Sequence, residues 1–403
     1  MPRIRRSVYV FFNRYDAPFL APGDLVRGAT EVRRAPKLLA ISVLRGAELE
    51  ISEHDFALLG SVPSDRWVEL EELAAEDKPR LRELAELGLV ISAEEDPLLV
   101  ELLRRDEQLT SGRWNVYAAL FHSLTKWRDV DFRRALGPEL EELPVQPAEA
   151  VAGLVELHGP PPPHFHVADG ALSELELPLV GRTGGLFAAL NKRRTARAFD
   201  REGTMALDEL ATVLYEVFGC RGYAPLGPGL AALKKTSPSG GSLHPIEAYV
   251  LVRNVTDVDA GIYHYRTDRH ALELLEPLAP GDAEELAAQF ACGQTYFAGA
   301  GALFILTARF ARSFWKYRKH RRAYGVLLMD AGHLSQTLYL VCAELGLGAF
   351  VTAAINGANI EERLGLDPFV EGALAVCGCG RPASAASQLE PEFLPYVPRE
   401  TLI

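Results

Sequence analysis

The 403-residue sequence contains few cysteines, and their number and surroundings argue against a disulfide framework. Five cysteines are present, an odd number, and most lie in apolar runs, as is typical of reduced thiols in a cytoplasmic protein. Cys377 and Cys379 lack the two-residue spacer of a redox or zinc pair, so we expect no metal there. The N-terminus lacks the long apolar run and cleavage site of a secretory signal. We therefore expect cytoplasmic localisation.

The sequence also lacks an excess of positively charged residues. Forty-two lysines and arginines stand against 54 aspartates and glutamates, and the net charge of −12 argues against nucleic acid as the principal partner. Apolar residues make up 48% and charged residues 24%, which is ordinary for a soluble globular protein. No Walker loop occurs, and no GxGxxG follows a strand to open a helix. A ligand that carries a phosphate would therefore be held in another way.

The most informative stretch is 322–348. Its apolar residues recur at three- and four-residue steps, the period of one helix face: Leu327, Ala331, Leu334, Leu338, Val341 and Leu345. The opposite side is nearly as apolar, so we expect a helix buried all round, in a core or a dimer interface, that ends at Gly346. Asp330, His333 and Gln336 argue against a membrane span. If buried, they require partners from the chain, a second subunit or a ligand.

Residues 1–95 predict a small mixed domain. Ser52 is a predicted helix N-cap, with Asp55 three residues on, and Gly88 is predicted to end a later helix. The expected elements, in chain order, are strands at 8–12 and 38–44, a helix after Ser52, helices from Val68 and Leu81, and a strand from Leu89.

This order indicates a winged-helix domain. It resembles the small recognition domain of enzymes that mature ribosomal peptides, which captures a leader peptide by adding it as a strand to a sheet edge. Ordinary winged-helix packing is the alternative. The acidic residues of the second expected helix disfavour binding to DNA.

Residues 96–180 are expected to connect this domain to a C-terminal one, with the main boundary near 170–185. The aromatic pattern of 113–128 predicts a helix that packs, and the tract 159–163 is a stiff polyproline spacer. Three histidines surround this tract without a carboxylate or cysteine at regular spacing, which favours a solvated loop over a metal site. They are His158, His164 and His166.

Two stretches of the C-terminal part are suited to an anionic, flat ligand. Arg193, Arg194 and Arg197 are spaced so that their guanidinium groups can converge on one phosphate, although a solvated basic face would also explain them. In the run 235–249, prolines and glycines allow the main chain to approach a flat ligand closely, and Ser239 offers a hydroxyl.

Six motifs occur in one order along the chain, and together they identify a family. They are R-R-T-A-R-A-F, P-S-G-G-S-L-H-P, W-K-Y-R-K-H-R-R-A-Y, D-A-G-H-L-S-Q-T-L-Y-L, A-E-L-G-L-G and C-G-R-P. Residues 185–385 thereby resemble the SagB-type dehydrogenases, a branch of the FMN-dependent nitroreductase superfamily that acts in ribosomal peptide maturation. F-H-S-L-T-K at 121–126 resembles a motif upstream of the same enzymes. The resemblance implies an α+β fold over 181–403, an antiparallel-dominated sheet flanked by helices, and FMN at a homodimer interface.

The resemblance also assigns the contacts with FMN. Arginines of the first and last motifs would contact the phosphate, and the P-S-G turn would line the ribityl chain and the isoalloxazine. A glutamine of the central helix would be a polar contact in the dimer core. Amides of 353–356 would pass the flavin face and stabilise negative charge on the reduced flavin. In chain order, the assigned residues are Arg193, Arg194, Arg197, Pro238, Ser239, Gly240, Gln336, Ala354, Ile355 and Arg381.

Lys316 and Tyr317 match the Lys-Tyr pair of the azoline dehydrogenases, and the resemblance implies that they are catalytic. Oxidising an azoline to an azole removes a hydride, which the flavin accepts, and a proton, which a protein base accepts. A lysine serves as a base at neutral pH when desolvation or neighbouring cations favour its neutral form, and 318–322 is strongly basic. A basic helix turn with a packed tyrosine is the alternative.

The leading hypothesis is an FMN-dependent dehydrogenase that oxidises azolines of a ribosomal peptide to thiazoles or oxazoles. Its partners would be the precursor peptide and a second copy of the chain, without nucleic acid, membrane or metal. No cyclodehydratase region occurs in the sequence, so a separate cyclodehydratase would supply the azoline. The alternatives are an NAD(P)H-dependent nitro- or quinone reductase and a non-catalytic leader-binding scaffold. The peptide, the ring and the electron acceptor stay open.

Overall fold

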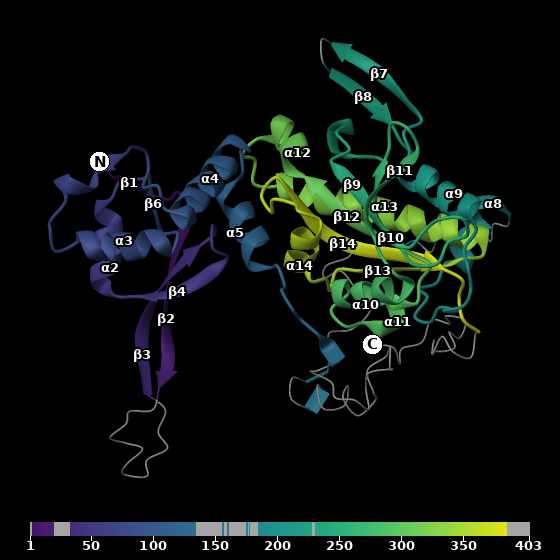
Figure 1. Ribbon diagram of the computed structural model, residues 1–403, viewed down its shortest axis with the longest axis horizontal. Coiled ribbons are helices and arrows are strands. Elements are labelled where there is room, and N and C mark those ends of the chain that lie inside the picture. Colours follow the sequence, from purple (N-terminus) through teal and green to yellow (C-terminus); the bar gives the residue numbers. More distant parts are fainter. Residues whose placement is uncertain are drawn as a thin grey trace.

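The computed structural model describes residues 2–19, 33–133, 184–227 and 230–384, together with positions 155, 156, 159, 160, 175 and 177. The described chain forms a larger C-terminal part around one sheet and a smaller N-terminal part, joined by two helices (Figure 1). The expected α+β class is confirmed. His158, His164 and His166, and most of the expected boundary at 170–185, lie outside the described residues.

The C-terminal part is built on a six-stranded sheet in which every neighbouring pair is antiparallel. The spatial order is β11-β10-β9-β12-β14-β13, with β9 and β12 in the middle. Residues of β9 and β12 are almost all buried, because helices cover both faces of these central strands. The bounds are β9 Ile246–Val252, β10 Gly261–Arg266, β11 Ala271–Pro277, β12 Ala302–Arg309, β13 Gly348–Thr352 and β14 Glu371–Gly380.

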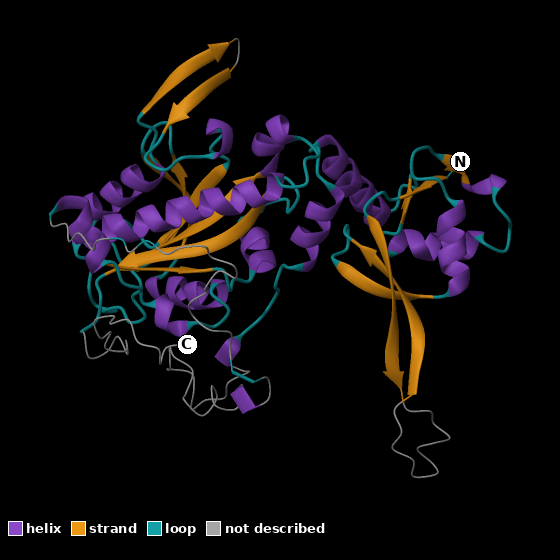
Figure 2. Ribbon diagram, turned by 180° about the vertical axis from the view of Figure 1, so that it is seen from behind, coloured by secondary structure: helices purple, strands orange, loops and turns teal. Residues whose placement is uncertain are grey.

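Two hydrophobic clusters lie on opposite faces of this sheet. On one face Val250 and Phe304 pack with α9 (Leu207–Phe218) and α13 (Ala323–Leu345), and α8 (Gly185–Lys192) lies beside α13. On the other face Leu251 and Leu303 pack with α10 (Pro280–Phe290), near α11 (Thr295–Ala298) and α14 (Gly357–Arg363). Figure 2 shows the two helical layers from behind. Neighbouring strand residues alternate between the clusters, as the two-residue period of a strand requires.

The helix predicted at 322–348 is α13, and it ends as expected at Gly346, a left-handed C-cap with φ 70°. Leu327, Ala331, Leu334 and Leu338 are buried, which confirms the predicted face. The expectation of burial all round is wrong for the single chain. Gly325, Leu328, Met329, Gly332 and Gln336 lie on an exposed face, because no other element among the described residues covers it. Among the described helices, α13 alone has the length and hydropathy to cross a membrane, a test that the core helix of a soluble protein also passes.

Two further elements complete the C-terminal part. The two-stranded hairpin of β7 (Gly222–Gly227) and β8 (Leu230–Lys234) projects from the body of the molecule (Figure 1). The short helix α12 (Phe310–Tyr317) follows β12 directly and leads into α13. All five cysteines are unpaired, and four of them are buried, as the sequence predicted; Cys220 is half-buried.

The N-terminal part contains two three-stranded sheets. One has the order β5-β1-β6, and the other is the long hairpin β2-β3 with β4 on its edge. The predicted cap at Ser52 is confirmed as a capping box. The Ser52 side chain accepts from the Asp55 amide, and the Asp55 side chain accepts from the Ser52 amide. The bounds are β1 Arg3–Arg6, β2 Val10–Phe19, β3 Arg33–Ser42, β4 Ala47–Ile51, α2 Glu53–Ser61, β5 Val68–Glu69, α3 Lys78–Glu86 and β6 Val90–Ser92.

The helix predicted from Val68 is wrong. Val68 and Glu69 pair with β1 as strand β5, and a single 3-10 turn, η1 (Leu70–Glu72), follows, with Leu70 fully buried. Pairing with β1 takes up the backbone groups that a helix would need. Strands β2, β3 and β6 and helix α3 occur where two strands, a third strand and a helix were predicted, but with other bounds, and Gly88 (φ 70°) follows the end of α3 as predicted. The winged-helix assignment stays a prediction.

Helices α4 (Pro97–Ser111) and α5 (Val116–Leu124) join the two parts. Trp114, between them, is fully buried, but Tyr117, Phe121 and Trp127 are exposed, so the predicted packing of the aromatic stretch holds only in part. One hydrophobic cluster runs without a break from Tyr9 and Leu44 through Trp114 to Phe310 and other residues of the C-terminal part. The two parts therefore share a core in this region.

Candidate flavin site and Lys-Tyr pair

The P-S-G-G loop (Pro238–Gly241) is tied to the middle of α13. Asp330, a buried carboxylate on α13, accepts hydrogen bonds from Ser239 Oγ at 2.5 Å and from the Gly240 amide at 3.1 Å. Ser239 Oγ also accepts a hydrogen bond from the His244 amide at 2.9 Å. Both the hydroxyl and the Gly240 amide are thus used inside the protein. A flat ligand at this loop would meet backbone atoms and the proline ring, rather than the hydroxyl that the sequence suggested.

The backbone around this loop is strained. Gly241, Ser242 and His244 adopt φ values of 65°, 57° and 46°, in the left-handed region. Glycine adopts this region freely, whereas each of the other two residues stores roughly 1–3 kcal/mol. Strain of this kind persists where surrounding contacts hold the backbone in one conformation. Here Ser242 Oγ and His244 Nε2 both contact the Leu233 carbonyl. The loop is therefore held in one conformation by β8 and α13.

The Lys-Tyr pair (Lys316 and Tyr317) lies directly over the two glycines of this loop. A Cβ atom on Gly241 would lie 2.7 Å from Lys316 Nζ and 3.0 Å from the Tyr317 hydroxyl oxygen, and one on Gly240 would lie 3.4 Å from that oxygen. Lys316 Nζ also lies 5.9 Å from the centre of the Tyr317 ring. Two motifs about 75 residues apart in the sequence thus form one surface.

The side chains of this pair differ in their exposure. Tyr317 is half-buried, whereas Lys316 is exposed in the single chain. The desolvation that a lysine base requires is therefore not supplied by the described part of its own chain, and would have to come from a second copy or from bound substrate.

A cavity of about 360 Å³ adjoins the loop. Its walls include Lys235, His244 and Arg312, and Arg312 Nε donates to the Leu243 carbonyl at 2.9 Å. Burial lowers the pKa of Lys235, and burial together with the charge of Lys235 lowers the pKa of His244. His244 is accordingly neutral near pH 7, whereas the hydrogen bond with Glu247 raises the pKa of His264, which also lines the cavity.

The first and last motifs of the sequence lie side by side. Phe199 forms an isolated bridge with Pro382, and the Asp200 amide donates to the Arg381 carbonyl at 2.9 Å. The Arg381 side chain donates to Glu209 at 2.7 Å, so it is anchored toward α9. The fold thereby brings R-R-T-A-R-A-F and C-G-R-P together, as a shared phosphate site requires.

The arginine motif also contacts α13, about one and a half turns before the helix ends. Arg193 lies over the ring of Tyr339 with its Cζ 5.4 Å from the centroid, and Thr195 Oγ1 lies 3.0 Å from the Tyr339 hydroxyl. Asp330 and Tyr339 are nine residues apart on α13, a separation of about 13 Å along its axis. One helix therefore carries both the arginine motif and the P-S-G-G loop.

The strand-loop after β13 lies near Arg197. Burial raises the pKa of Tyr296, and the positive charge of Arg197 opposes this rise. Gln294 donates to the Tyr296 hydroxyl and accepts from Thr352 Oγ1 at 3.0 Å, which ties this corner to β13. The Tyr296 hydroxyl and Thr352 thus lie between the arginine motif and the segment at 353–356.

Only some amides of 353–356 are available to a ligand. The Ala354 amide donates to Thr352 Oγ1 at 3.1 Å, and the Asn356 amide donates to the Phe290 carbonyl at 3.0 Å. The amides of Ala353 and Ile355 have no acceptor among the residues that the structure describes. These two donors suit a developing negative charge, whereas the Ala354 amide is already used.

Several of these positions suit an FMN molecule. Arg193, Arg197 and Arg381 would hold its phosphate, and the amide of Ile355 offers a donor. The space next to the two glycines is filled by Val326, Lys316 and Tyr317, so a flat ring would lie beside these side chains. Gln336 is exposed on the open face of α13, so a contact between it and FMN requires that face to be covered. No group of three or more potential metal ligands occurs in the described ranges.

The F-H-S-L-T-K motif forms a buried polar network. His122 Nε2 donates to the Pro368 carbonyl at 2.7 Å, so Nδ1 accepts from the Tyr324 hydroxyl at 2.9 Å. Lys126 Nζ lies 2.8 Å from Glu361, and the other oxygen of Glu361 accepts from the Ala373 amide. Burial lowers the pKa of His122 and of Lys126 and raises that of Glu361. The motif thus joins α5 to α13 and α14.

Sequence reasoning missed several residues of the site. Asp330 was recognised as a polar residue that needs a partner, but not as the residue that holds the P-S-G-G loop. Gln294 and Thr352 lie in ordinary-looking stretches and offered no signal. The placement of the Lys-Tyr pair over Gly240 and Gly241 depends on the path of α12, which no local pattern reveals.

A family model described as Nitroreductase family matches residues 190–381. The putative nitroreductase MJ1384 of Methanocaldococcus jannaschii is 31% identical over 198 residues, which cover 48% of this chain and 91% of that protein.

Two relatives are named for peptide processing. The trifolitoxin-processing protein TfxB of Rhizobium leguminosarum bv. trifolii is 35% identical over 36% of this chain and 38% of its own length. The microcin B17-processing protein McbC of Escherichia coli is 30% identical over 35% of this chain and 52% of its own length. The chain therefore spans about half or less of these two relatives. Among solved structures, the E. coli microcin synthetase McbBCD complex with truncated pro-MccB17 gives a TM-score of 0.45 at 22% identity, covering 61% of this chain and 87% of the other.

Proposed function

Because the chain belongs to the nitroreductase family, we propose that it is an FMN-dependent dehydrogenase that oxidises azolines of a ribosomal peptide to thiazoles or oxazoles. The observation that carries the proposal is the position of Lys316 Nζ and the Tyr317 hydroxyl over Gly240 and Gly241. The similarity to TfxB and McbC, both named for the processing of peptides, supports the substrate class.

The chain's own residues have distinct roles in this proposal. FMN, when bound, supplies the acceptor for the hydride that leaves the azoline ring. Lys316 takes the ring proton, and Tyr317, within reach of the same glycines, orients the substrate or shares that proton. Bound peptide and a second copy of the chain would exclude water from Lys316, which favours the neutral amine that a base requires.

The FMN-binding residues follow from the same geometry. Arginines of the first and last motifs would hold the phosphate, and the P-S-G-G loop would face the ring, held in place by Asp330. The amides at 353–355 would lie at the flavin face. In chain order, the proposed FMN-binding residues are Arg193, Arg194, Arg197, Pro238, Ser239, Gly240, Gln336, Ala354, Ile355 and Arg381.

We propose that the active form is a homodimer formed over α13. Leu328 and Met329 are 45% and 62% exposed on this helix, although apolar residues of a long central helix are ordinarily covered. Gly325 and Gly332 on the same face would let a second helix approach closely. A second copy over this face would also cover Gln336.

The N-terminal part is proposed to bind the leader of the precursor peptide. Its outer strands β2 and β4 each pair on one side only in the described chain, so each offers an edge for an added strand. We keep the division into 1–95, 96–180 and 181–403 as a proposal. A separate cyclodehydratase would form the azoline before this enzyme oxidises it.

The test uses purified full-length protein, reconstituted with FMN, and a peptide that contains an azoline. The expected result is the loss of two hydrogens from the peptide by mass spectrometry. Lys316→Ala should abolish this loss, whereas Lys319→Ala, a matched change on the same basic segment, should retain it. No loss of mass in the presence of a cyclodehydratase and the leader-bearing precursor would refute the proposal.

The same preparation separates the alternatives. Rapid flavin reduction by NADPH with turnover of a nitroarene, and none with the peptide, would indicate a nitro- or quinone reductase, as the name of MJ1384 suggests for that relative. Protein that cannot be reconstituted with FMN but still binds the leader would indicate a scaffold.

A further inference from the structure

The residues from Arg113 to His122, which precede the region matched by the nitroreductase model, hold the stretch that carries the Lys-Tyr pair. α12 ends at Tyr317, and the chain turns at Arg318 with φ 47° before α13 begins. The last carbonyls of a helix have no partners within it and must find donors elsewhere. Here Arg113 donates to the Trp315 carbonyl in the last turn of α12 at 3.3 Å, and Asn115 Nδ2 donates to the Lys319 carbonyl in the turn after α12 at 3.0 Å.

These two carbonyls bracket Lys316 and Tyr317. The start of α12 is held differently, by the C-terminal part itself. The Arg309 amide donates to the Pro245 carbonyl, and the Phe310 amide donates to the Val370 carbonyl. The end of the helix, where the pair lies, thus receives its side-chain donors from the region that joins the two parts.

Aromatic contacts extend this support along the whole stretch. The ring of Trp114 lies 4.6 Å from that of Phe310 and 5.0 Å from that of Phe314, on the inner face of α12. The Tyr117 ring lies 5.8 Å from the guanidinium of Arg321. The next turn of α5 reaches α13 through the hydrogen bond between His122 and Tyr324.

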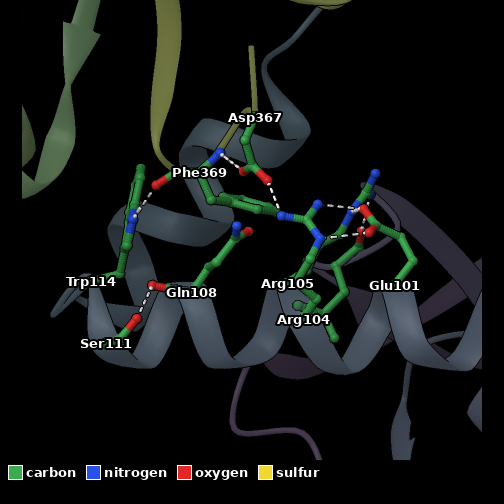
Figure 3. A network of polar contacts seen from close by, with 9 residues as sticks. Glu101, Arg104, Arg105, Gln108, Ser111, Trp114, Asp367 and Phe369 are labelled. Atoms are coloured by element: carbon green, nitrogen blue, oxygen red, sulfur yellow. Dashed lines mark hydrogen bonds and ion pairs between the residues drawn. The ribbon is translucent and has the colours of Figure 1, made fainter. Parts of the chain in front are cut away.

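The supporting segment is itself anchored, as Figure 3 shows. Arg104 on α4 donates to Asp367 at 2.5 Å and is held by Glu101 of the same helix. Trp114 Nε1 donates to the Phe369 carbonyl at 3.1 Å. The segment is therefore anchored to the loop before β14 as well as to α12.

We propose that Arg113 and Asn115 are positioning residues for the Lys-Tyr pair, so that the region joining the two parts completes the active site. The inference rests on the proposed function for the role of Lys316. Proton transfer depends on the position of the base, and a misplacement of about 1 Å costs on the order of a hundredfold in rate.

Two substitutions test the positioning role of Arg113 and Asn115 separately from effects on the stability of the fold. In Asn115→Asp the side chain still caps α5, because Oδ1 of Asn115 accepts from the Tyr117 and Ala118 amides and an aspartate accepts in the same way. It loses only the donor to Lys319. In Arg113→Gly the backbone, at φ 60°, is relieved of strain while the guanidinium is removed.

A matched control removes a cap that does not touch α12. Asp96 caps α4 by accepting from the Leu98 and Leu99 amides, so Asp96→Ala lowers stability without altering the Lys-Tyr pair. The measurements are hydrogen–deuterium exchange over 313–324, FMN content, and kcat and KM with the azoline peptide.

In Asn115→Asp and Arg113→Gly we expect faster exchange over 315–322 and a kcat lower by about tenfold or more, with KM and FMN content within about twofold of wild type. Asp96→Ala should keep the wild-type kcat. Unchanged exchange, or an equal loss of kcat in Asp96→Ala, would overturn the proposal. If Lys316→Ala retained full turnover, the assignment of the base would fail, and the exchange data would still decide whether Arg113 and Asn115 position this stretch.

Discussion

Ser239 donates its hydroxyl hydrogen to Asp330 at 2.5 Å, and this hydrogen bond joins the loop proposed to face the flavin to the long helix α13. The same carboxylate accepts from the Gly240 amide, so one buried charge fixes two consecutive residues of the loop. Charge-assisted hydrogen bonds of this kind contribute about 1.5–3 kcal/mol each.

Asp330→Asn should therefore release the P-S-G-G loop. The amide would keep one acceptor and present a donor to the other partner, so we expect a loss of about 2 kcal/mol in the free energy of unfolding. Weaker FMN binding should accompany this loss. Urea denaturation and fluorimetric titration of the apoprotein with FMN measure the two effects.

Asp106→Asn is the control for this change. Asp106 is also buried and accepts from Ser7 and Arg5, but it lies on α4, outside the C-terminal part. It should cost similar stability and leave the affinity for FMN unchanged. Equal weakening of FMN binding in both variants would contradict a specific role for Asp330.

Gly241→Ala should displace the Lys-Tyr pair. The added Cβ would lie 2.7 Å from Lys316 Nζ, at a backbone φ of 65°. The left-handed backbone alone costs about 1–2 kcal/mol with a Cβ present. The expected outcome is this loss of stability together with a fall in kcat for the azoline peptide.

Gly346→Ala provides the comparison, because Gly346 has φ 70° and no atom within 4 Å of its added Cβ. It should lose similar stability in urea and retain kcat. A Gly241→Ala enzyme with wild-type kcat would show that the pair need not lie against this loop.

The stability of the protein should fall in acid, partly because of His122. Burial holds the pKa of His122 well below its ordinary value, so the imidazole stays neutral in the folded state while the unfolded chain takes up a proton near pH 6.5. The free energy of unfolding therefore falls as the pH drops through about 6.5, by up to about 1.4 kcal/mol per pH unit from this group. His122→Gln should show a shallower decline between pH 7.5 and 5.5.

His264 changes the stability of the protein with pH in the opposite direction. Its hydrogen bond with Glu247 raises its pKa, so protonation at low pH favours the folded state, and this contribution is lost as the pH rises through the folded pKa. His264→Gln should make the acid-side decline steeper. Urea denaturation at several pH values measures both slopes, and equal slopes in the two variants would contradict the assignment.

The five thiols should differ sharply in reactivity. Burial raises the pKa of Cys292 to about 11 and raises that of Cys377 as well, whereas Cys220 is half-buried. Thiolates are the reactive form, so the native protein should react rapidly at one thiol with Ellman's reagent, and at all five after denaturation. Cys220→Ser should remove the rapid reaction. Rapid reaction of a second thiol would show that the core opens readily.

Much of the local structure could be predicted because its signals are local. The capping box at Ser52 needs only Asp55 three residues on, and the C-cap at Gly346 needs a residue that tolerates positive φ. The predicted helix from Val68 failed because pairing with β1, a contact distant in the chain, took its backbone groups.

The sequence by itself determined the elements and the kinds of residue in the site: arginines for a phosphate, a glycine-bearing loop for a flat ring, and a Lys-Tyr pair. The tertiary structure decided which of these meet. It set the pair over Gly240 and Gly241, used Ser239 to bind Asp330, and placed Arg113 and Asn115 at the end of α12. The reason is physical: side-chain type and helix or strand period are properties of neighbouring residues, whereas these contacts join residues about 75 to 200 positions apart through the packing of whole helices on the sheet.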